Sequence, residues 1–359
     1  MGRRGNGTRR LRVAAGTVVV LAATMAPGAA VADPSPAPVP GTPVCEVRGG
    51  RLSEISGMAA TDRGFVMVND GADDEARRRI FFLDDRCAVV RTVSYPSRPR
   101  DTEDLAVGAD GTVWVADIGD NDRSRQTIAV WKLPPGADRP VLYRMAYPDG
   151  PHDAEALLVT GDDRPVVVTK YSANLYAPSA ALRPGTTAPL VKVGQVRLPA
   201  STTSNPFGAL GRTAVTGGAT APDGRRVVLR TYADAYEFDV ADGDVVAALT
   251  GGTPRVVALP DEPQGESVTY DRDGRSLLTV SETAGRPPGT MPRILRYPLP
   301  AAVSSPAPTA TPGPTTPAAG AGAARSGGGP YLVVAGALGL ALIAVGLVAL
   351  ARARRARSR

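Results

Sequence analysis

The feature of this chain that most constrains its fold is an internal repeat. Five segments superpose on their turns, each with a short strand, a turn and a more apolar strand, and their equivalent starts are Ser56, Glu103, Glu155, Thr216 and Glu266. These starts are 47, 52, 61 and 50 residues apart. A spacing near 50 residues is what one four-stranded propeller blade with its loops requires. The repeat therefore predicts an all-β fold, a single β-propeller with five blades. A propeller of six is the alternative if the 61-residue interval hides a degenerate blade.

The segments between these starts agree with an all-β chain. Apolar runs rich in β-branched residues are separated by turn signals such as Ala109-Asp110-Gly111 and Pro222-Asp223-Gly224. Segments 33–43 and 301–329 are rich in Pro, Ala, Thr and Gly and cannot build a core. We interpret them as a leader and a stalk, with the propeller over 44–300. In it, segment 44–52 would complete the last blade and close the ring. A β-sandwich of similar composition is the alternative fold.

The N-terminus has the three parts of a secretory signal peptide. A start with five arginines precedes an apolar run over 13–25, and Ala30-Val31-Ala32 is a small-x-small cleavage site. We predict a signal peptide over 1–32 and a mature chain that begins at Asp33. An uncleaved anchor is the alternative, but the run is short for a bilayer that needs about 20 apolar residues.

The C-terminus predicts a membrane anchor. Tyr331 to Ala351 is a run of 21 residues without a charge, and five arginines follow it at once. Such a run is long enough to span a bilayer, and clustered arginine marks the cytoplasmic side. We predict a transmembrane helix over 330–351, a basic cytoplasmic tail over 352–359, and a cell-membrane protein with its N-terminal domain outside. A buried core helix is the alternative, although such helices usually carry a polar face.

The charge of the chain has to be read by segment. The whole chain has 41 basic and 35 acidic residues, but five arginines belong to the signal peptide and five to the tail. Segment 33–329 therefore has 31 basic and 35 acidic residues. Since the excess of positive charge comes from the two ends, it does not indicate nucleic-acid binding, and we predict no nucleic-acid partner.

The chain has two cysteines, Cys45 and Cys87, and both lie in the predicted extracellular part. Outside the cell a pair of cysteines is expected to form a disulfide. A metal site on this thiolate pair is disfavoured, because the chain has a single histidine to complete the coordination.

The repeat also predicts where polar groups converge. In a propeller the first strand of each blade lines the central channel, so repeat-equivalent residues form a ring around one axis. Three of the ring positions are Glu103, Glu155 and Glu266. The ends of the following strands add more charged side chains, so we predict a ligand-binding channel mouth that also contains Asp70, Asp117, Lys170, Arg230 and Glu282.

Three interpretations of the ring remain open: a structural one, a functional one as a ligand or calcium site, and hydrolysis by the same residues. In the structural one, each glutamate accepts hydrogen bonds from a neighbouring blade or pairs with Lys170 or Arg230. In the functional one, the convergent oxygens hold a hard cation such as calcium, with Glu103, Glu155, Glu266 and Asp117 as metal ligands. The loop over 117–122 is either a further calcium loop or an ordinary turn rich in Asp, Asn and Gly.

Four phrases carry a resemblance to a known family: DTEDLA over 101–106, DIGDN over 117–121, DAEALL over 153–158 and QGESVT over 264–269. They resemble secreted bacterial β-propellers of the phytase-like or esterase-like group. The resemblance covers roughly residues 45–300 and implies a propeller fold. Phytases of this kind bind calcium ions through acidic residues and hydrolyse phosphate esters, so it also implies calcium as a cofactor.

Two functions are therefore expected for the exported domain. The first is a membrane-anchored extracellular module that binds a ligand or a partner, or acts as a scaffold. The alternative is a calcium-dependent hydrolase of phosphate or carboxylate esters. No catalytic residue is assigned. The single histidine, His152, is a solvated loop residue or a general base, and no Gly-x-Ser-x-Gly elbow provides a nucleophile.

Overall fold

The computed structural model describes residues 40–71, 74–259 and 262–299. Over these ranges the chain forms twenty strands and two short helices, α1 (Gly208–Gly211) and α2 (Val245–Gly251). The predicted signal peptide 1–32, stalk 301–329, span 330–351 and tail 352–359 lie outside the described residues. Among the residues that are described, no helix is long and apolar enough to cross a membrane.

Three sheets contain four antiparallel strands each. One is formed by β2 (Ile55–Thr61), β3 (Gly64–Asn69), β4 (Arg79–Leu83) and β5 (Val89–Ser94). Another is formed by β14 (Val215–Thr220), β15 (Arg226–Thr231), β16 (Asp234–Asp239) and β17 (Arg255–Ala258). The third joins both ends of the described chain in the order β18 (Gly265–Tyr270), β19 (Ser276–Ser281), β20 (Arg293–Pro298) and β1 (Thr42–Glu46).

The remaining sheet has eight strands and consists of two runs of antiparallel neighbours. The first run is β6 (Thr102–Val107), β7 (Val113–Asp117), β8 (Ile128–Leu133) and β9 (Val141–Ala146). The second is β10 (Ala154–Val159), β11 (Pro165–Thr169), β12 (Asn174–Pro178) and β13 (Thr187–Gln195). The two runs meet where β13 pairs in parallel with β9, from Thr187 opposite Arg144 to Pro189 opposite Ala146.

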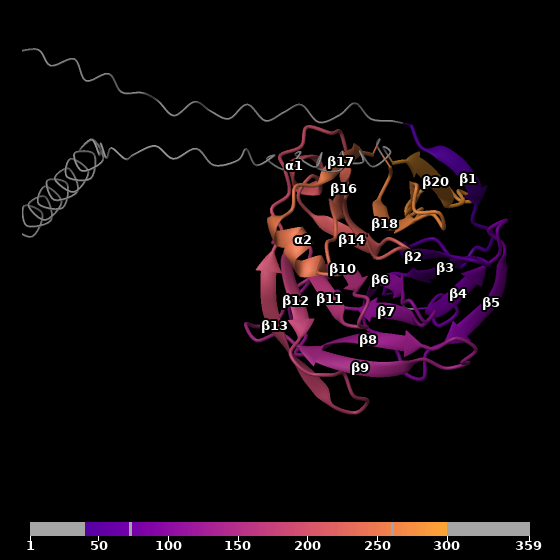
Figure 1. The fold of residues 1–359 in the computed structure, drawn as a ribbon. Coiled ribbons are helices and arrows are strands. Elements are labelled where there is room, and N and C mark those ends of the chain that lie inside the picture. The colour runs from indigo at the N-terminus through magenta and orange to yellow at the C-terminus, as the bar shows by residue number, and fades with distance from the viewer. Residues whose placement is uncertain (1–39, 72–73, 260–261, 300–359) are drawn as a thin grey trace, which may run out of the picture. The chain divides into compact units, whose positions relative to one another are not determined.

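The first strand of each four-stranded sheet, and the first strand of each run in the eight-stranded sheet, belong to one closed ring. Strand β2 contacts β6, which contacts β10, and the ring continues through β14 and β18 back to β2. Figure 1 shows these strands around the centre, with β5, β9 and β13 toward the outside. Sheets that radiate from a central ring form a β-propeller. The predicted all-β propeller is confirmed, and the sandwich alternative does not apply.

The hydrophobic core lies between neighbouring sheets. Val66 and Ile80 from the sheet of β2 to β5, for example, pack in one buried cluster with Val115 of β7 and Trp131 of β8. The hairpins at the ends of the sheets use the predicted turn signals, since Gly111, Gly224 and Gly274 all have positive φ. That backbone region favours glycine, which lacks a Cβ atom.

The N-terminal strand completes the last sheet, as segment 44–52 was predicted to do. Strand β1 pairs with β20 from Thr42, opposite Arg296, to Glu46, opposite Arg293. Pairing starts two residues before the predicted segment and ends at Glu46, so residues 47–52 of that segment do not pair with β20. The pairing covers the edge of β20 that would otherwise be open.

The predicted disulfide between Cys45 and Cys87 is present and links β1 to the turn that follows β4. It spans 42 residues of sequence.

Replacing both cysteines by alanine is expected to lower the free energy of unfolding by about 3–4 kcal/mol, because the unfolded chain regains the entropy of an open loop. Urea denaturation of the full chain measures this loss. Reductant should produce the same shift in the wild type and none in the double variant, and a shift below about 1 kcal/mol would contradict the prediction.

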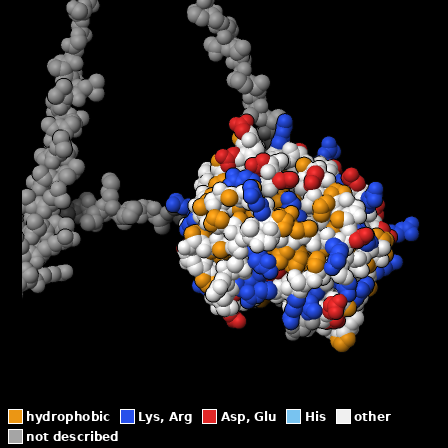
Figure 2. All heavy atoms as spheres, turned by 90° about the horizontal axis from the view of Figure 1, so that it is seen from below, with side chains coloured by type: hydrophobic (Ala, Val, Ile, Leu, Met, Phe, Trp, Pro, Cys, Tyr) orange, Lys and Arg blue, Asp and Glu red, His pale blue; other side chains and the backbone are white. Residues whose placement is uncertain are grey.

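The outer surface carries a mixture of charged and apolar side chains. Figure 2 shows blue basic side chains spread over the face seen from below, with apolar side chains gathered near its middle. Large apolar side chains that remain exposed in the described part include Val141, Val191 and Tyr171. Apolar residues exposed singly are common on the surfaces of folded proteins.

Candidate functional site at the channel mouth

A β-bulge marks the same position near the start of every innermost strand. The pairing register with the next strand skips one residue in β2, β6, β10, β14 and β18, and the skipped residues are Ser56, Glu103, Glu155, Thr216 and Glu266. These are the repeat-equivalent positions of the sequence. A bulge leaves one residue out of the ladder and redirects its side chain. The fold therefore presents the same five side chains that the sequence repeat aligned.

The two hydroxyl residues of this ring have structural roles. Ser56 donates a hydrogen bond of 2.8 Å to the carbonyl oxygen of Thr102, and Thr216 donates one of 3.2 Å to the carbonyl of Gly265. Each acceptor lies directly before the bulge residue of a neighbouring inner strand. A carboxylate accepts hydrogen bonds and cannot donate one. The three ring glutamates therefore cannot make this contact in their ionised form.

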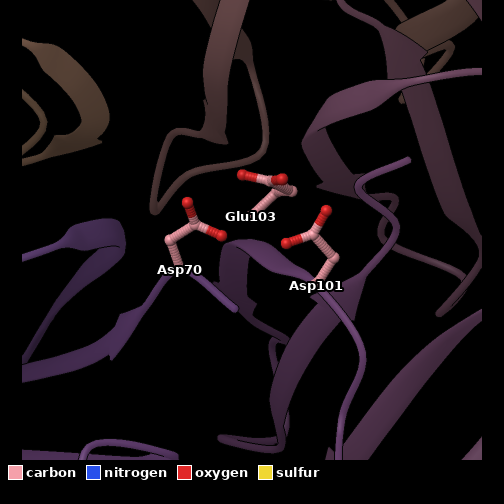
Figure 3. Close-up of side chains that lie close together, drawn as sticks. All are labelled: Asp70, Asp101 and Glu103. Atoms are coloured by element: carbon pink, nitrogen blue, oxygen red, sulfur yellow. The ribbon is translucent and has the colours of Figure 1, made fainter. Parts of the chain in front are cut away.

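Glu103 lies in a group of three carboxylates. Its side chain is buried, and one oxygen each from Asp70, Asp101 and Glu103 lie within 4.8 Å of one another. Figure 3 shows the three carboxyl groups pointing toward a common centre. Asp70 follows β3, whereas Asp101 directly precedes β6. The group thus joins two neighbouring sheets.

Glu103 also belongs to a second group, with Asp153 and Glu155, in which one oxygen from each residue again lies within 4.8 Å of the others. All three residues are buried. Lys170 forms an ion pair with Glu155 Oε1, as one of the predicted pairings required. The other oxygen of Glu155, Oε2, is buried and has no hydrogen-bond partner within the described residues.

The third ring glutamate, Glu266, is held by donors. Tyr232 donates a hydrogen bond of 3.1 Å and Gln264 one of 3.2 Å to its Oε1. Glu282 interacts with Glu266, and Oε1 of Glu282 is a further buried oxygen without a partner in the described part of the chain. Seven carboxylates therefore lie at the mouth: Asp70, Asp101, Glu103, Asp153, Glu155, Glu266 and Glu282.

Five of these carboxyl groups, those of Asp101, Glu103, Glu155, Glu266 and Glu282, have a raised pKa and hold protons more tightly than isolated ones. Burial, followed by the hydrogen bond to Asp70 and repulsion from its charge, raises the pKa of Asp101 to about 7. Burial and then repulsion from Glu266 raise the pKa of Glu282 to about 10. Burial also raises the pKa of Glu103, and repulsion from Glu155 adds to it. Burial alone would lower the pKa of Lys170, but the charge of Glu155, its hydrogen bond and the charges of Asp153 and Glu103 together outweigh burial and raise it. The ammonium group of Lys170 does not balance the negative charge of the cluster, since the pKa values of the neighbouring carboxyl groups stay raised.

The structure places the predicted residue Asp117 beside the cluster in a positioning role. Its carboxylate accepts hydrogen bonds from the backbone N–H groups of Arg100 and Asp101 and from the guanidinium of Arg125, at 2.9 to 3.2 Å. These bonds fix the segment that carries Asp101. Asp120 of the same loop accepts hydrogen bonds from the backbone N–H groups of Ser124 and Arg125. These bonds within the loop agree with an ordinary turn, which was one of the two alternatives for residues 117–122.

Arg230 has partners other than the ring glutamates. Its side chain is completely buried and lies 3.1 Å from Glu262 Oε2. The guanidinium also donates to the carbonyl oxygens of Ser267 and Thr231. All these groups are internal, so the arginine is satisfied within the fold. The predicted pairing of Arg230 with a ring glutamate is replaced by its pairing with Glu262, which lies four residues before Glu266.

His152 has protein partners in its loop. Its Nε2 lies 2.9 Å from Asp149 Oδ1 and 3.0 Å from the hydroxyl of Tyr176, and its ring packs edge-on against Tyr147. The side chain is 24% exposed. It is thus more enclosed than a freely solvated loop residue.

The sequence interpretation missed Asp101, Asp153 and Asp104. A signal for the first two was present, because each aspartate precedes a ring glutamate by two residues. Asp104 had no such signal. Its buried carboxylate accepts the N–H groups of Leu157 at 2.9 Å and Gly218 at 3.2 Å, which lie in the next two inner strands. Asp104 therefore ties three inner strands together beneath the cluster.

Comparisons with known proteins concern the fold. No protein-family model and no curated protein sequence matches the chain. A gluconolactonase from Xanthomonas campestris is 16% identical, with 75% of this chain and 99% of that chain covered and a TM-score of 0.39. A luciferin-regenerating enzyme is 12% identical, with 68% and 76% covered and a TM-score of 0.39. An aldose sugar dehydrogenase from Streptomyces coelicolor is 14% identical, with 73% and 98% covered and a TM-score of 0.37. At these values the similarity says nothing of the activity of this chain.

Proposed function

We propose that this chain is a membrane-anchored extracellular β-propeller that binds a divalent cation, calcium by its ligand chemistry, at the acidic mouth of its channel. The bound cation would in turn recruit an extracellular ligand or partner. The anchor and the extracellular location rest on the sequence of the two chain ends. The narrower assignment to the phytase-like group rests on the four quoted phrases.

One observation carries the proposal: buried carboxylate oxygens of the mouth lack partners. Glu155 Oε2 and Glu282 Oε1 are buried without a hydrogen bond from the described residues, although both side chains are at least nine-tenths buried. A buried charge without compensation costs several kcal/mol. A cation would supply that compensation.

The donor set favours calcium over softer metals. Every side chain of the two carboxylate groups offers oxygen, and neither group contains histidine or cysteine. Calcium takes six to eight oxygen ligands in flexible geometry, whereas zinc prefers nitrogen and sulfur in a tetrahedral site. Asp70, Asp101, Glu103, Asp153 and Glu155 are the residues that would hold the ion.

The test is a calorimetric calcium titration of the full chain after dialysis against a chelator. We expect saturable binding, together with a higher thermal midpoint when calcium is present. Zinc and magnesium titrations at the same ionic strength serve as comparisons. Absence of saturable binding for every divalent cation would overturn the proposal.

Cation binding is expected to strengthen as the pH rises from 6 to 8. Because the pKa of Asp101 is raised to about 7, a proton competes with the cation below that pH. Affinity should change about tenfold per pH unit for each displaced proton. Without the cation, the stability of the folded protein changes with pH in the opposite direction. Asp101 then keeps its proton in the folded state between about pH 4 and 7, and Glu282 keeps its proton up to about pH 10, so stability falls as pH rises over this range. Thermal midpoints against pH, with and without calcium, check both slopes.

We also infer that the propeller has five blades. The eight-stranded sheet divides into two four-strand runs, and the shared parallel pairing involves the outer strands β9 and β13. The ring of inner strands has one member per run. This division supports the repeat count, and the 61-residue interval is filled by the loop that contains α1.

A metal-dependent ester hydrolase is the second candidate function. The observation that favours it is the pKa of Asp101, about 7, since a group that titrates near neutral pH suits general acid–base chemistry. A panel of phosphate and carboxylate esters, assayed with calcium and with chelator, tests this candidate. Turnover that requires both calcium and Asp101 would support it, and calcium binding without turnover on any ester would leave a binding module.

A further inference from the structure

A cavity of about 220 Å³ lies where the loop after β3 meets the segment that joins β5 to β6. Its wall combines cationic and hydroxyl-bearing side chains: Arg78, Arg79, Arg98, Ser94, Ser97 and Tyr95. Glu75 also lines it, with its side chain 79% exposed and 3.3 Å from Arg79. Three guanidinium groups against one carboxylate give the wall a positive formal charge.

Arg79 of this wall has a donor atom without an acceptor in the described part of the chain. It donates a hydrogen bond to Ser94 Oγ, which is a contact across neighbouring strands. Its Nε atom is buried and has no acceptor among the described residues. A buried donor without an acceptor costs free energy, and an oxyanion would provide the acceptor. The planar fork of a guanidinium matches carboxylate, sulfate and phosphate oxygens.

The size of the cavity also suits a polyatomic anion. Its volume is several times the roughly 30 Å³ that one water molecule occupies in the liquid. The wall borders the acidic cluster in sequence, because Pro99 lines the cavity and Asp101 belongs to the carboxylate group. The cavity and the carboxylate group thus draw residues from the same two segments, the loop after β3 and the connection from β5 to β6.

We propose that this cavity is an oxyanion-binding site that takes the carboxylate, sulfate or phosphate group of an extracellular ligand. The inference goes beyond the proposed cation site, since it uses different residues and does not require a bound cation. The two sites together would suit a ligand whose anionic group enters the arginine cavity while another part reaches the cation.

The experiment titrates the full chain with sulfate, phosphate and acetate at constant ionic strength, with chloride as the balancing anion and a chelator present. We expect saturable binding in the wild type and a loss of at least tenfold in affinity for Arg79→Gln. Arg79→Lys should lie between them, because it keeps the charge and loses the fork. Arg144→Gln is the matched control, since Arg144 is an exposed arginine of β9 outside the cavity wall.

Two further variants separate this site from the cation site. Glu103→Gln should retain anion binding, and Arg79→Gln should retain calcium binding if the proposed function holds. Should Arg79→Gln fail to fold, Arg98→Gln replaces it. Preference for acetate would identify a carboxylate ligand, and preference for sulfate or phosphate a tetrahedral one. Absence of saturable binding for all three anions, or equal affinity in the wild type and the arginine variants, would overturn the proposal.

Discussion

Glu103→Gln is expected to weaken calcium binding about 100-fold or more and to leave the cation-free protein equally or more stable. Glu103 belongs to both carboxylate groups, so its replacement removes a ligand from each. Loss of an outer-shell contact costs 10–100-fold in metal affinity, and loss of a direct ligand should cost at least as much. In the empty protein the same change relieves repulsion from Glu155, which raises the pKa of Glu103. Calorimetry and melting curves measure the two effects.

The matched control for Glu103→Gln is Asp138→Asn. Asp138 is an acidic residue in the turn between β8 and β9, with its side chain 94% exposed. The Asp138→Asn change removes one negative charge outside the cluster, so calcium affinity and the thermal midpoint should both stay near the wild-type values. Glu155→Gln is an informative companion, because it also leaves Lys170 without its ion-pair partner. A clear fall in the midpoint of Glu103→Gln, with no cation bound by the wild type, would establish the structural interpretation.

Arg230→Met is expected to lower the free energy of unfolding by about 3–5 kcal/mol. The change removes the partner of a fully buried ion pair and leaves Glu262 as an uncompensated charge. Glu262 also accepts hydroxyl hydrogen bonds from Thr279 and Tyr297, both at 2.8 Å, so it cannot turn toward water. Urea denaturation measures the loss.

A double-mutant cycle tests whether this loss comes from the ion pair. Arg230→Met combined with Glu262→Gln should lose clearly less than the sum of the single losses, because the second change removes the unpaired charge. Arg293→Met is the control for an exposed pair, since Arg293 and Glu46 are about half exposed and such pairs contribute about 0–1 kcal/mol. Additive effects in the cycle, or a loss below 1 kcal/mol for Arg230→Met, would contradict the expectation.

The candidate site was only partly predictable. The ring positions Glu103, Glu155 and Glu266 followed from the repeat, because equivalent residues of a repeat lie at equivalent places around one axis. Lys170 was correctly expected to pair with a ring glutamate. Arg230 was expected to do the same and instead pairs with Glu262, whose position in a loop between two blades carries no repeat signal.

The all-β propeller, its closing strand and the Cys45–Cys87 bridge could be predicted before folding was considered, because they depend on period, apolar patterning and a count of two cysteines. Which charged side chains meet depends instead on how the sheets pack in the folded chain. Asp70, Asp101 and Asp153 reach the glutamates from loops whose paths depend on packing between sheets, and Asp117 is drawn into backbone and guanidinium contacts. A repeat specifies the strand a side chain comes from, whereas its partner is set by contacts between residues far apart in sequence. The cavity around Arg79 arises in the same way, from two loops that meet only in the folded chain.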